Sequence, residues 1–304
     1  MSALVVVTGA SSGIGRATAH RLAGRGDRLV LMARSPEPLQ DTVDECVALG
    51  AAAVEAISVD VTDDTAVAAA FARVRRQHGA IDAVVQSAGV AAYGRFDQVP
   101  AAVFDGVIRT NVLGAANVAR AVLADMREAD HGTILIVGSV IGSIAVPQMS
   151  AYTVSKWALR SLARELAIEN RDRKGVRVVH VAPGGVDTPI YRQAANYQGY
   201  VGRPPPPVYS PERVAGIIVR AIDRPRDRVQ AGFANPLMAL GFAVLPRVYD
   251  ALVGPLFAVA ATDDELVAPH PGNVTETASG WHQLHGRQGS TTVAIAKALG
   301  RLAR

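Results

Sequence analysis

Tyr152 and Lys156 are the residues of this sequence whose types and spacing are best suited to chemistry. They are four positions apart, and on a helix residues at that spacing project from the same face. A free tyrosine has a pKa of about 10, which is too high for acid–base work at neutral pH. Because a nearby ammonium stabilises the phenolate, it lowers that pKa. The pair therefore predicts a tyrosine that exchanges protons during carbonyl reduction or alcohol oxidation.

A glycine-rich turn follows the first apolar run of the chain. Its glycines are Gly9, Gly13 and Gly15, and its other members include Ser11, Ser12 and Ile14. Glycines permit a tight turn and let a pyrophosphate approach N–H groups at a helix N-terminus, where the helix dipole favours an anion. The spacing is a variant of the dinucleotide-binding fingerprint. A plain strand-to-helix turn is the alternative, but three glycines at the first such junction favour nucleotide binding.

The residues at the end of the second apolar run indicate which dinucleotide fits. A carboxylate there would bind the ribose 2′-hydroxyl of NAD, whereas an arginine accommodates the 2′-phosphate of NADP. The sequence has Ala33 and Arg34, and no acidic residue follows before Glu37. A guanidinium matches a phosphate in charge and geometry. We therefore expect NADP(H), with NAD(H) as the alternative.

Short apolar runs alternate with amphipathic stretches over residues 1–232. The expected strands are 3–8, 28–33, 53–59, 83–87, 133–138, 177–181 and 228–231, and the expected helices are 13–26, 38–49, 63–78, 101–129, 150–172 and 210–223. This alternation predicts an α/β fold, a Rossmann-like doubly wound parallel sheet of about seven strands with helices on both faces. Ligands bind at the carboxyl ends of such strands. The glycine-rich turn and the run ending at Ser139 both lie there.

With these motifs in place, the sequence resembles the short-chain dehydrogenase/reductase family over about residues 3–232. The glycine-rich turn matches the family's own, Ser139 matches its catalytic serine thirteen residues before Tyr152, and Asn111 matches the asparagine of its tetrad. The resemblance implies further cofactor contacts, which are Asp60 and Val61 at the adenine, Ala88 and Gly89 after the fourth strand, and Pro183, Gly184, Val186 and Thr188 in the segment that closes over the nicotinamide.

The resemblance also implies a role for each member of the tetrad. Tyr152 exchanges a proton with the substrate oxygen, and Lys156 lowers its pKa and holds the nicotinamide ribose. Ser139 stabilises charge on the substrate oxygen, and Asn111 holds a water that relays protons. The cofactor supplies the hydride. The alternatives on the same fold are a non-catalytic NADP(H)-sensing regulator and an epimerase or dehydratase, but the complete tetrad favours the oxidoreductase.

One motif departs from the family pattern. The family's Asn-Asn-Ala-Gly after the fourth strand is replaced by Gln86, Ser87, Ala88 and Gly89. The two small residues that a closely approaching cofactor needs are kept, but the asparagine that normally braces the central sheet is not.

The segment from Val186 to Tyr209 corresponds to a lid over the substrate, and it contains four tyrosines and five prolines. An aromatic and apolar lining predicts a hydrophobic alcohol or ketone. Arg192 and Arg203 leave an anionic group on the substrate open.

Residues 233–304 form a C-terminal extension outside the resemblance, with a short basic helix expected at 292–304. The apolar stretch 237–261 has the length of a membrane span, but Pro246, Arg247, Asp250 and Pro255 are costly inside lipid. We expect a pair of short helices that cover the pocket or pack between subunits of a homodimer or homotetramer. Contact with a membrane surface is the alternative.

Composition limits the partners further. The net charge is +4 with a sequence pI near 9.4, but the basic residues are scattered, so we expect no nucleic-acid partner. A single cysteine, Cys46, excludes an intrachain disulfide and a cysteine-based metal site. His282 and His285 have no evident third ligand, so we expect no metal. The beginning of the chain does not resemble a signal peptide, and a cytoplasmic enzyme is expected.

Overall fold

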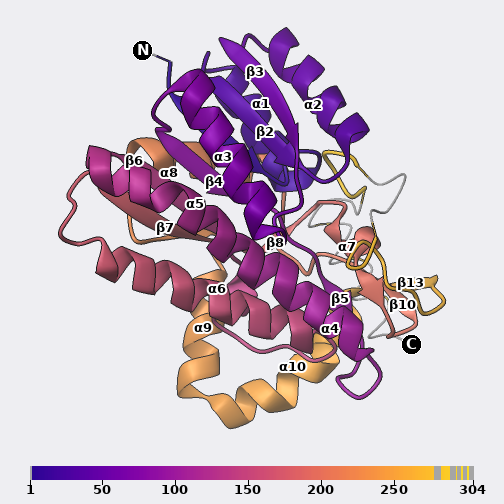
Figure 1. Cartoon of the computed structure of the whole chain (residues 1–304). Coiled ribbons are helices and arrows are strands. Elements are labelled where there is room, and N and C mark those ends of the chain that lie inside the picture. Colours follow the sequence, from indigo (N-terminus) through magenta and orange to yellow (C-terminus); the bar gives the residue numbers. More distant parts are fainter. Residues whose placement is uncertain (1, 277–281, 288–291, 293–295, 297–299, 301–304) are drawn as a thin grey trace.

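A seven-stranded parallel sheet forms the centre of the computed structural model, which describes residues 2–276 and 282–287 and positions 292, 296 and 300. The strands are β1 (Leu4–Thr8), β2 (Arg28–Ala33), β3 (Ala53–Ser58), β4 (Ala83–Gln86), β6 (Gly132–Val137), β7 (Val176–Pro183) and β12 (Arg228–Ala231), in the order β12-β7-β6-β4-β1-β2-β3. Figure 1 shows this sheet between its helices. The predicted doubly wound, Rossmann-like fold is confirmed. The helix expected at 292–304 lies mostly outside the described residues.

Helices cover both faces of the sheet, and alternate side chains of β1 show why. Leu4 and Val6 belong to the apolar core on one face, whereas Val5 and Val7 belong to the core on the other. The first core contains residues of α3 (Asp64–His78), α5 (Gly114–Ala129) and α6 (Ser150–Glu169), and the second contains residues of α1 (Gly13–Ala23), α2 (Pro36–Ala48) and α8 (Pro211–Asp223). Strands buried on both faces need almost continuous apolar sequence, which is the pattern that predicted them.

The helix expected over 101–129 is not continuous. It consists of α4 (Ala101–Ile108), a π-helical segment (Arg109–Leu113) and α5. The Gly114 N–H donates to the carbonyl of Arg109, five residues earlier, where an α-helix would use the residue four positions back. The π segment contains Asn111, whose side chain is fully buried.

Short elements that the sequence did not predict occupy the loops at the carboxyl edge of the sheet. They are β5 (Ala92–Tyr93), a 3₁₀ turn (Val140–Gly142), β8 (Gly185–Val186), α7 (Ile190–Gln193), β9 (Ala195–Asn196), β10 (Tyr200–Gly202) and β11 (Val208–Tyr209).

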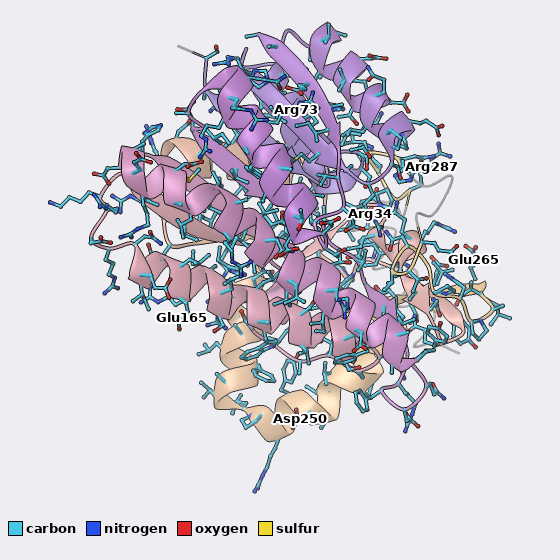
Figure 2. All side chains as sticks on the ribbon, viewed as in Figure 1. Arg34, Arg73, Glu165, Asp250, Glu265 and Arg287 are labelled. Carbon is cyan, nitrogen blue, oxygen red and sulfur yellow. The ribbon has the colours of Figure 1, made fainter. Side chains whose placement is uncertain are left out.

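The C-terminal extension begins with two short helices, as expected, α9 (Asn235–Val244) and α10 (Pro246–Ala260), and continues into β13 (Thr262–Leu266), which pairs with β10. The Tyr249 hydroxyl donates to the Ala145 carbonyl at 2.7 Å and so fixes this helix pair to the domain. Asp250 marks its outer end in Figure 2. Exposed apolar side chains line the pair, namely Leu237, Leu240, Val244, Leu245, Val248, Leu252 and Leu256. Within the described residues, no helix combines the length and apolar character needed to cross a membrane.

Candidate active site

The glycine-rich turn is packed so closely that two of its glycines leave no room for a side chain. A Cβ atom on Gly15 would lie 2.2 Å from the carbonyl oxygen of Gly9, and a Cβ atom on Gly9 would lie 2.7 Å from the backbone nitrogen of Ala88. Gly9 and Gly13 also have positive φ values of 64° and 49°, which favour glycine. The turn therefore brings the first turn of α1 and the end of β4 together around a cradle that fits a phosphate group.

Gln86 supplies the brace that the missing family asparagine would provide. Its side-chain carbonyl accepts a hydrogen bond of 2.5 Å from the Thr8 hydroxyl. The same hydroxyl accepts hydrogen bonds from the backbone N–H groups of Ser87 and Ala88, both at 3.2 Å. β1 and β4 are thus tied together next to the cradle. The support of the sheet is therefore kept, although glutamine provides it in place of the family's asparagine.

Tyr152, Ser139 and Lys156 come together at the carboxyl ends of β6 and β4. The Ser139 side chain lowers the pKa of the Tyr152 hydroxyl, and the Ser139 hydroxyl accepts a hydrogen bond from the backbone N–H of Ile141 at 3.2 Å. The Lys156 ammonium lies 5.3 Å from the centre of the Tyr152 ring and donates to the Val137 carbonyl at 3.1 Å. The sequence spacing therefore does place phenol and ammonium side by side on α6.

Burial controls the proton affinities of this pair. It raises the pKa of Tyr152 to about 12, against a smaller lowering by the Ser139 side chain, and it lowers the pKa of Lys156 to about 8. The sequence predicted the opposite direction for the tyrosine, with Lys156 as its cause. That prediction was wrong for this structure because desolvation of the phenolate outweighs the attraction of a cation that faces the ring and bonds to Val137. At neutral pH the phenol carries its proton.

Asn111 acts as a brace in the structure. Its side-chain oxygen accepts from the Val90 N–H at 2.8 Å, and its side-chain nitrogen donates to the Val90 carbonyl and the Ser155 hydroxyl, both at 2.9 Å. The loop after β4 is thereby joined to α6. Gly89 lies between Asn111 and Lys156. A Cβ atom on Gly89 would lie 3.2 Å from the Asn111 side-chain oxygen. The water-holding role stays a prediction.

An open cleft connects the cradle to Tyr152. The predicted site residues that line it are Gly9, Ser11, Ser12, Gly13, Ile14, Arg34, Asp60, Val61, Ala88, Gly89, Tyr152, Lys156 and Thr188. The others lie outside its lining, namely Gly15, Asn111, Ser139, Pro183, Gly184 and Val186. Gly15 lies behind the turn against Gly9, and Gly184 packs against Asn235 and Tyr209 instead.

Sequence reasoning missed several residues of the cleft. Most of them adjoin a motif residue, as Ser35 adjoins Arg34 and Gly138 adjoins Ser139. Two come from the C-terminal extension, Asn273 and His282, and nothing in their local sequence indicated this position.

His285 forms an ion pair of 2.7 Å with Glu212. The described part of the chain has no group of three His, Cys, Asp or Glu side chains that could hold a metal ion.

The sheet order, the glycine cradle and the Ser–Tyr–Lys cluster together define a dinucleotide-binding oxidoreductase fold. Residues 3–198 match the family model described as short chain dehydrogenase. The chain belongs to the short-chain dehydrogenase/reductase family and is an oxidoreductase of that type. Enzymes of this family bind NAD(P)(H) and small substrates and are often oligomers.

Known relatives match mainly the Rossmann domain. The chain is 38% identical over 193 residues to 2-(R)-hydroxypropyl-CoM dehydrogenase of Xanthobacter autotrophicus, which covers 62% of this chain and 77% of the relative. A short-chain dehydrogenase/reductase of Burkholderia phymatum in complex with NAD superposes with a TM-score of 0.73 at 25% identity, covering 81% of this chain and 95% of that one. An alcohol dehydrogenase of Thermococcus sibiricus complexed with 5-hydroxy-NADP gives a TM-score of 0.65 at 29% identity, covering 76% and 94%.

Proposed function

We propose that this protein is an NADP(H)-dependent oxidoreductase that interconverts a hydrophobic ketone or aldehyde and its alcohol. The observation that carries the proposal is the cluster of Tyr152, Ser139 and Lys156 at the end of a cleft that begins at a phosphate cradle. Bound NADPH would supply the hydride at this end of the cleft. The extension beyond residue 232 is proposed to act as a separate unit of the chain that contributes to the site.

The proton step follows from the state of the tyrosine. Because the pKa of Tyr152 is about 12, its hydroxyl is protonated at neutral pH and can donate to a carbonyl oxygen that gains negative charge. Ser139 would donate a second hydrogen bond to the same oxygen. Lys156 has a pKa of about 8, so it is mostly a cation near pH 7, and it would stabilise the phenolate that remains.

An apolar cluster around Tyr152 supports a hydrophobic substrate. Tyr152 packs with Tyr93, Met149 and Tyr191 on the domain side, and the cluster also includes Phe257 of α10. Burial raises the pKa of Tyr93 and of Tyr191, so both remain neutral. Neutral aromatic and thioether surfaces favour an apolar body on the substrate over a charged one.

Arg34 supports NADP(H) as the preferred cofactor. Its guanidinium lines the cleft after β2 beside Ala33, and it donates to the backbone carbonyl of Asn273 at 2.8 Å. A guanidinium has further N–H donors for a 2′-phosphate. Figure 2 shows Arg34 near the centre of the molecule, on the side that carries Arg287. The homologous structures named above contain either NAD or an NADP derivative. The cofactor preference therefore has to be tested on this chain itself.

Replacing Ala33 by aspartate is expected to reverse the cofactor preference. The new carboxylate would accept hydrogen bonds from a ribose 2′-hydroxyl and repel a 2′-phosphate. We expect the Kd of NADPH to rise by about a hundredfold and that of NADH to fall, since like-charge juxtaposition costs several kcal/mol. Fluorescence titration of each reduced dinucleotide measures this. Gln77→Glu adds the same charge on the exposed end of α3 and serves as the control; an unchanged NADPH affinity in Ala33→Asp would refute the assignment.

The proposed reaction is tested by a screen of ketones, aldehydes and alcohols for a change in NADPH absorbance. We expect turnover with apolar carbonyl compounds, and little with small charged ones. A nucleotide-sensing regulator would bind NADPH and show no turnover with any compound. An epimerase or dehydratase would transform its substrate without net change in absorbance, so product analysis of the same reactions distinguishes all three.

A further inference from the structure

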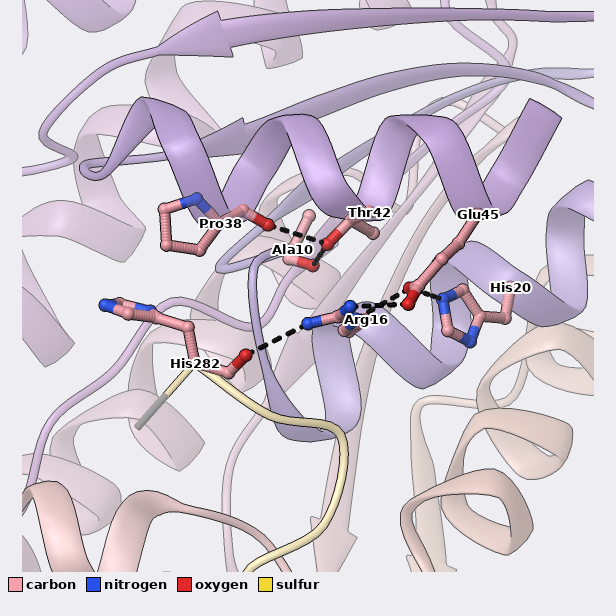
Figure 3. Close-up of polar contacts among 7 residues, drawn as sticks. All are labelled: Ala10, Arg16, His20, Pro38, Thr42, Glu45 and His282. Atoms are coloured by element: carbon pink, nitrogen blue, oxygen red, sulfur yellow. Dashed lines mark hydrogen bonds and ion pairs between the residues drawn. The ribbon is translucent and has the colours of Figure 1, made fainter. Parts of the chain in front are cut away.

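A short segment of the C-terminal extension crosses the outer edge of the dinucleotide cleft. We call residues 282–287 the strap. The Arg16 guanidinium donates to the His282 carbonyl at 3.0 Å, as Figure 3 shows, and the Gly13 N–H donates to the Gln283 carbonyl at 3.0 Å. At its other end, the Gly286 N–H donates to the Asp187 carbonyl at 3.3 Å. The strap therefore contacts both the glycine-rich turn and the loop after β7.

These two contact regions are the opposite walls of the cleft at the phosphate cradle. Thr188 lies directly across from Gly13, where a Cβ atom on Gly13 would be 3.1 Å from the threonine methyl group. Both residues line the cleft. A segment bonded to residues 13 and 187 thus joins the two walls beside the cradle.

The strap is bonded to a buried arginine that other side chains hold in place. Arg16 is buried and is held by the Glu45 carboxylate through two hydrogen bonds of 2.8 and 2.6 Å, and Glu45 also contacts His20. Figure 3 shows Arg16 between Glu45 on one side and the His282 carbonyl on the other. The hydrogen bond with Arg16 is the main cause of the lowered pKa of Glu45, so this carboxylate stays charged well below neutral pH.

Gly286 is the point at which the strap fits most tightly. A Cβ atom there would lie 2.3 Å from the carbonyl oxygen of Thr188 and 3.1 Å from the side chain of Asp187. The neighbouring His285 adds an ion pair with Glu212 at 2.7 Å. Any side chain at position 286 would therefore push the strap away from the loop after β7, while the bonds of the cradle itself would stay intact.

We propose that the strap closes the dinucleotide site and slows release of the bound cofactor. The proposal rests on dinucleotide binding at the glycine-rich turn. The strap uses one N–H group of the first turn of α1, and a helix N-terminus has several. Asn273 and His282 are among the lining residues of the cleft, so the extension forms part of the wall of the site. Release of a long, extended cofactor then requires the bridge between residues 13 and 187 to open.

The test compares Gly286→Ala and Gly286→Val with Gly241→Ala, a control on α9 where an added Cβ meets no atom within 4 Å. Stopped-flow fluorescence measures the dissociation rate of NADPH, and titration measures its Kd. We expect dissociation to be about tenfold faster in Gly286→Val and the Kd to rise in proportion, because the loss of one or two hydrogen bonds weakens binding by about this factor. The control should match the wild type.

Two results would overturn the proposal. An unchanged dissociation rate would mean that the strap has no part in retention, and a lower Kd would mean that it competes with the cofactor. Hydrogen exchange of the peptide that contains residues 282–287 gives a second measurement in the unmodified protein. We expect NADPH to slow exchange there, whereas faster exchange would indicate competition. Both readouts are binding measurements, so they stand even if the substrate screen finds no turnover and the proposed reaction fails.

If Gly286→Val does not fold, Glu212→Gln provides the milder variant. It removes only the charge that pairs with His285, on an exposed part of α8. We expect dissociation about twofold faster, in line with the small energy of an exposed ion pair. A rate equal to that of the wild type, together with unaltered exchange of the strap, would count against the proposal.

Discussion

Tyr152→Phe is expected to abolish turnover while dinucleotide binding stays nearly intact. The change removes one hydroxyl and, with it, the proton that the substrate oxygen needs. The ring keeps its packing against Tyr93 and Phe257, so the local structure is retained. Loss of a positioned general acid costs about 10²–10⁴ in rate. We expect kcat to fall by about 10³ with the best compound of the screen.

The matched control is Tyr200→Phe, because Tyr200 lies exposed on β10. It should retain the activity of the wild type. The NADPH Kd of Tyr152→Phe, measured by fluorescence titration, should stay within about threefold of the unmodified protein, since only one hydroxyl is lost. Turnover within tenfold of the wild type would remove Tyr152 from its proposed role. A large loss of NADPH binding would instead assign the hydroxyl to cofactor binding.

Gly15→Ala is expected to eliminate dinucleotide binding. The added methyl group would lie 2.2 Å from the Gly9 carbonyl oxygen, and a backbone atom cannot move aside as a flexible side chain can. The turn would open, and the N–H groups of α1 would lose their common direction. We expect the Kd of NADPH to rise more than a hundredfold and the free energy of unfolding to drop by about 1–3 kcal/mol, as in overpacked cores.

Gly24→Ala, directly after the end of the same helix, is the control. Gly24 follows α1 with φ of −64°, and a Cβ there would meet its nearest neighbour at an ordinary 3.6 Å. Alanine fits this conformation and should leave both stability and binding unaffected. Thermal unfolding and NADPH titration of the two variants separate a local effect on the cradle from a general effect on the helix. A Gly15→Ala protein that binds NADPH like the wild type would show that the turn adapts.

The central strands were predictable because they are buried on both faces, which demands a continuous apolar run such as Val5 to Val7. The interruption of the 101–129 helix was not, because a single i to i+5 turn shifts the apolar positions by only one residue. The replacement of the family asparagine was visible in the sequence, but only the hydrogen bond between Thr8 and Gln86 shows that the support is retained.

The candidate site was predictable where one local motif contains all the parts. The glycine-rich turn and the Tyr152–Lys156 pair are such motifs, and the structure brings both to one cleft. The pKa of Tyr152 was not predictable, because its direction depends on burial by segments far away in sequence. The strap was missed for the same reason. One partner, Gly13, is separated from the strap by most of the chain. The other partner, Asp187, is separated from it by α8 and much of the C-terminal extension.

The π segment that contains Asn111 restricts how many residues this part of the chain can have. Buried positions recur at 103, 107, 111, 115 and 119, every fourth residue, whereas an α-helix completes a turn in 3.6. The π segment contains one wide turn with an extra residue, and this turn compensates for the difference between the four-residue repeat and the 3.6-residue turn of an α-helix. Removing a single residue between 109 and 113 would rotate α5 by about 100° relative to α4. Either Asn111 would leave Val90, or Val118 would turn from the core to solvent, so insertions and deletions at this point are constrained far more tightly than its helical sequence suggests.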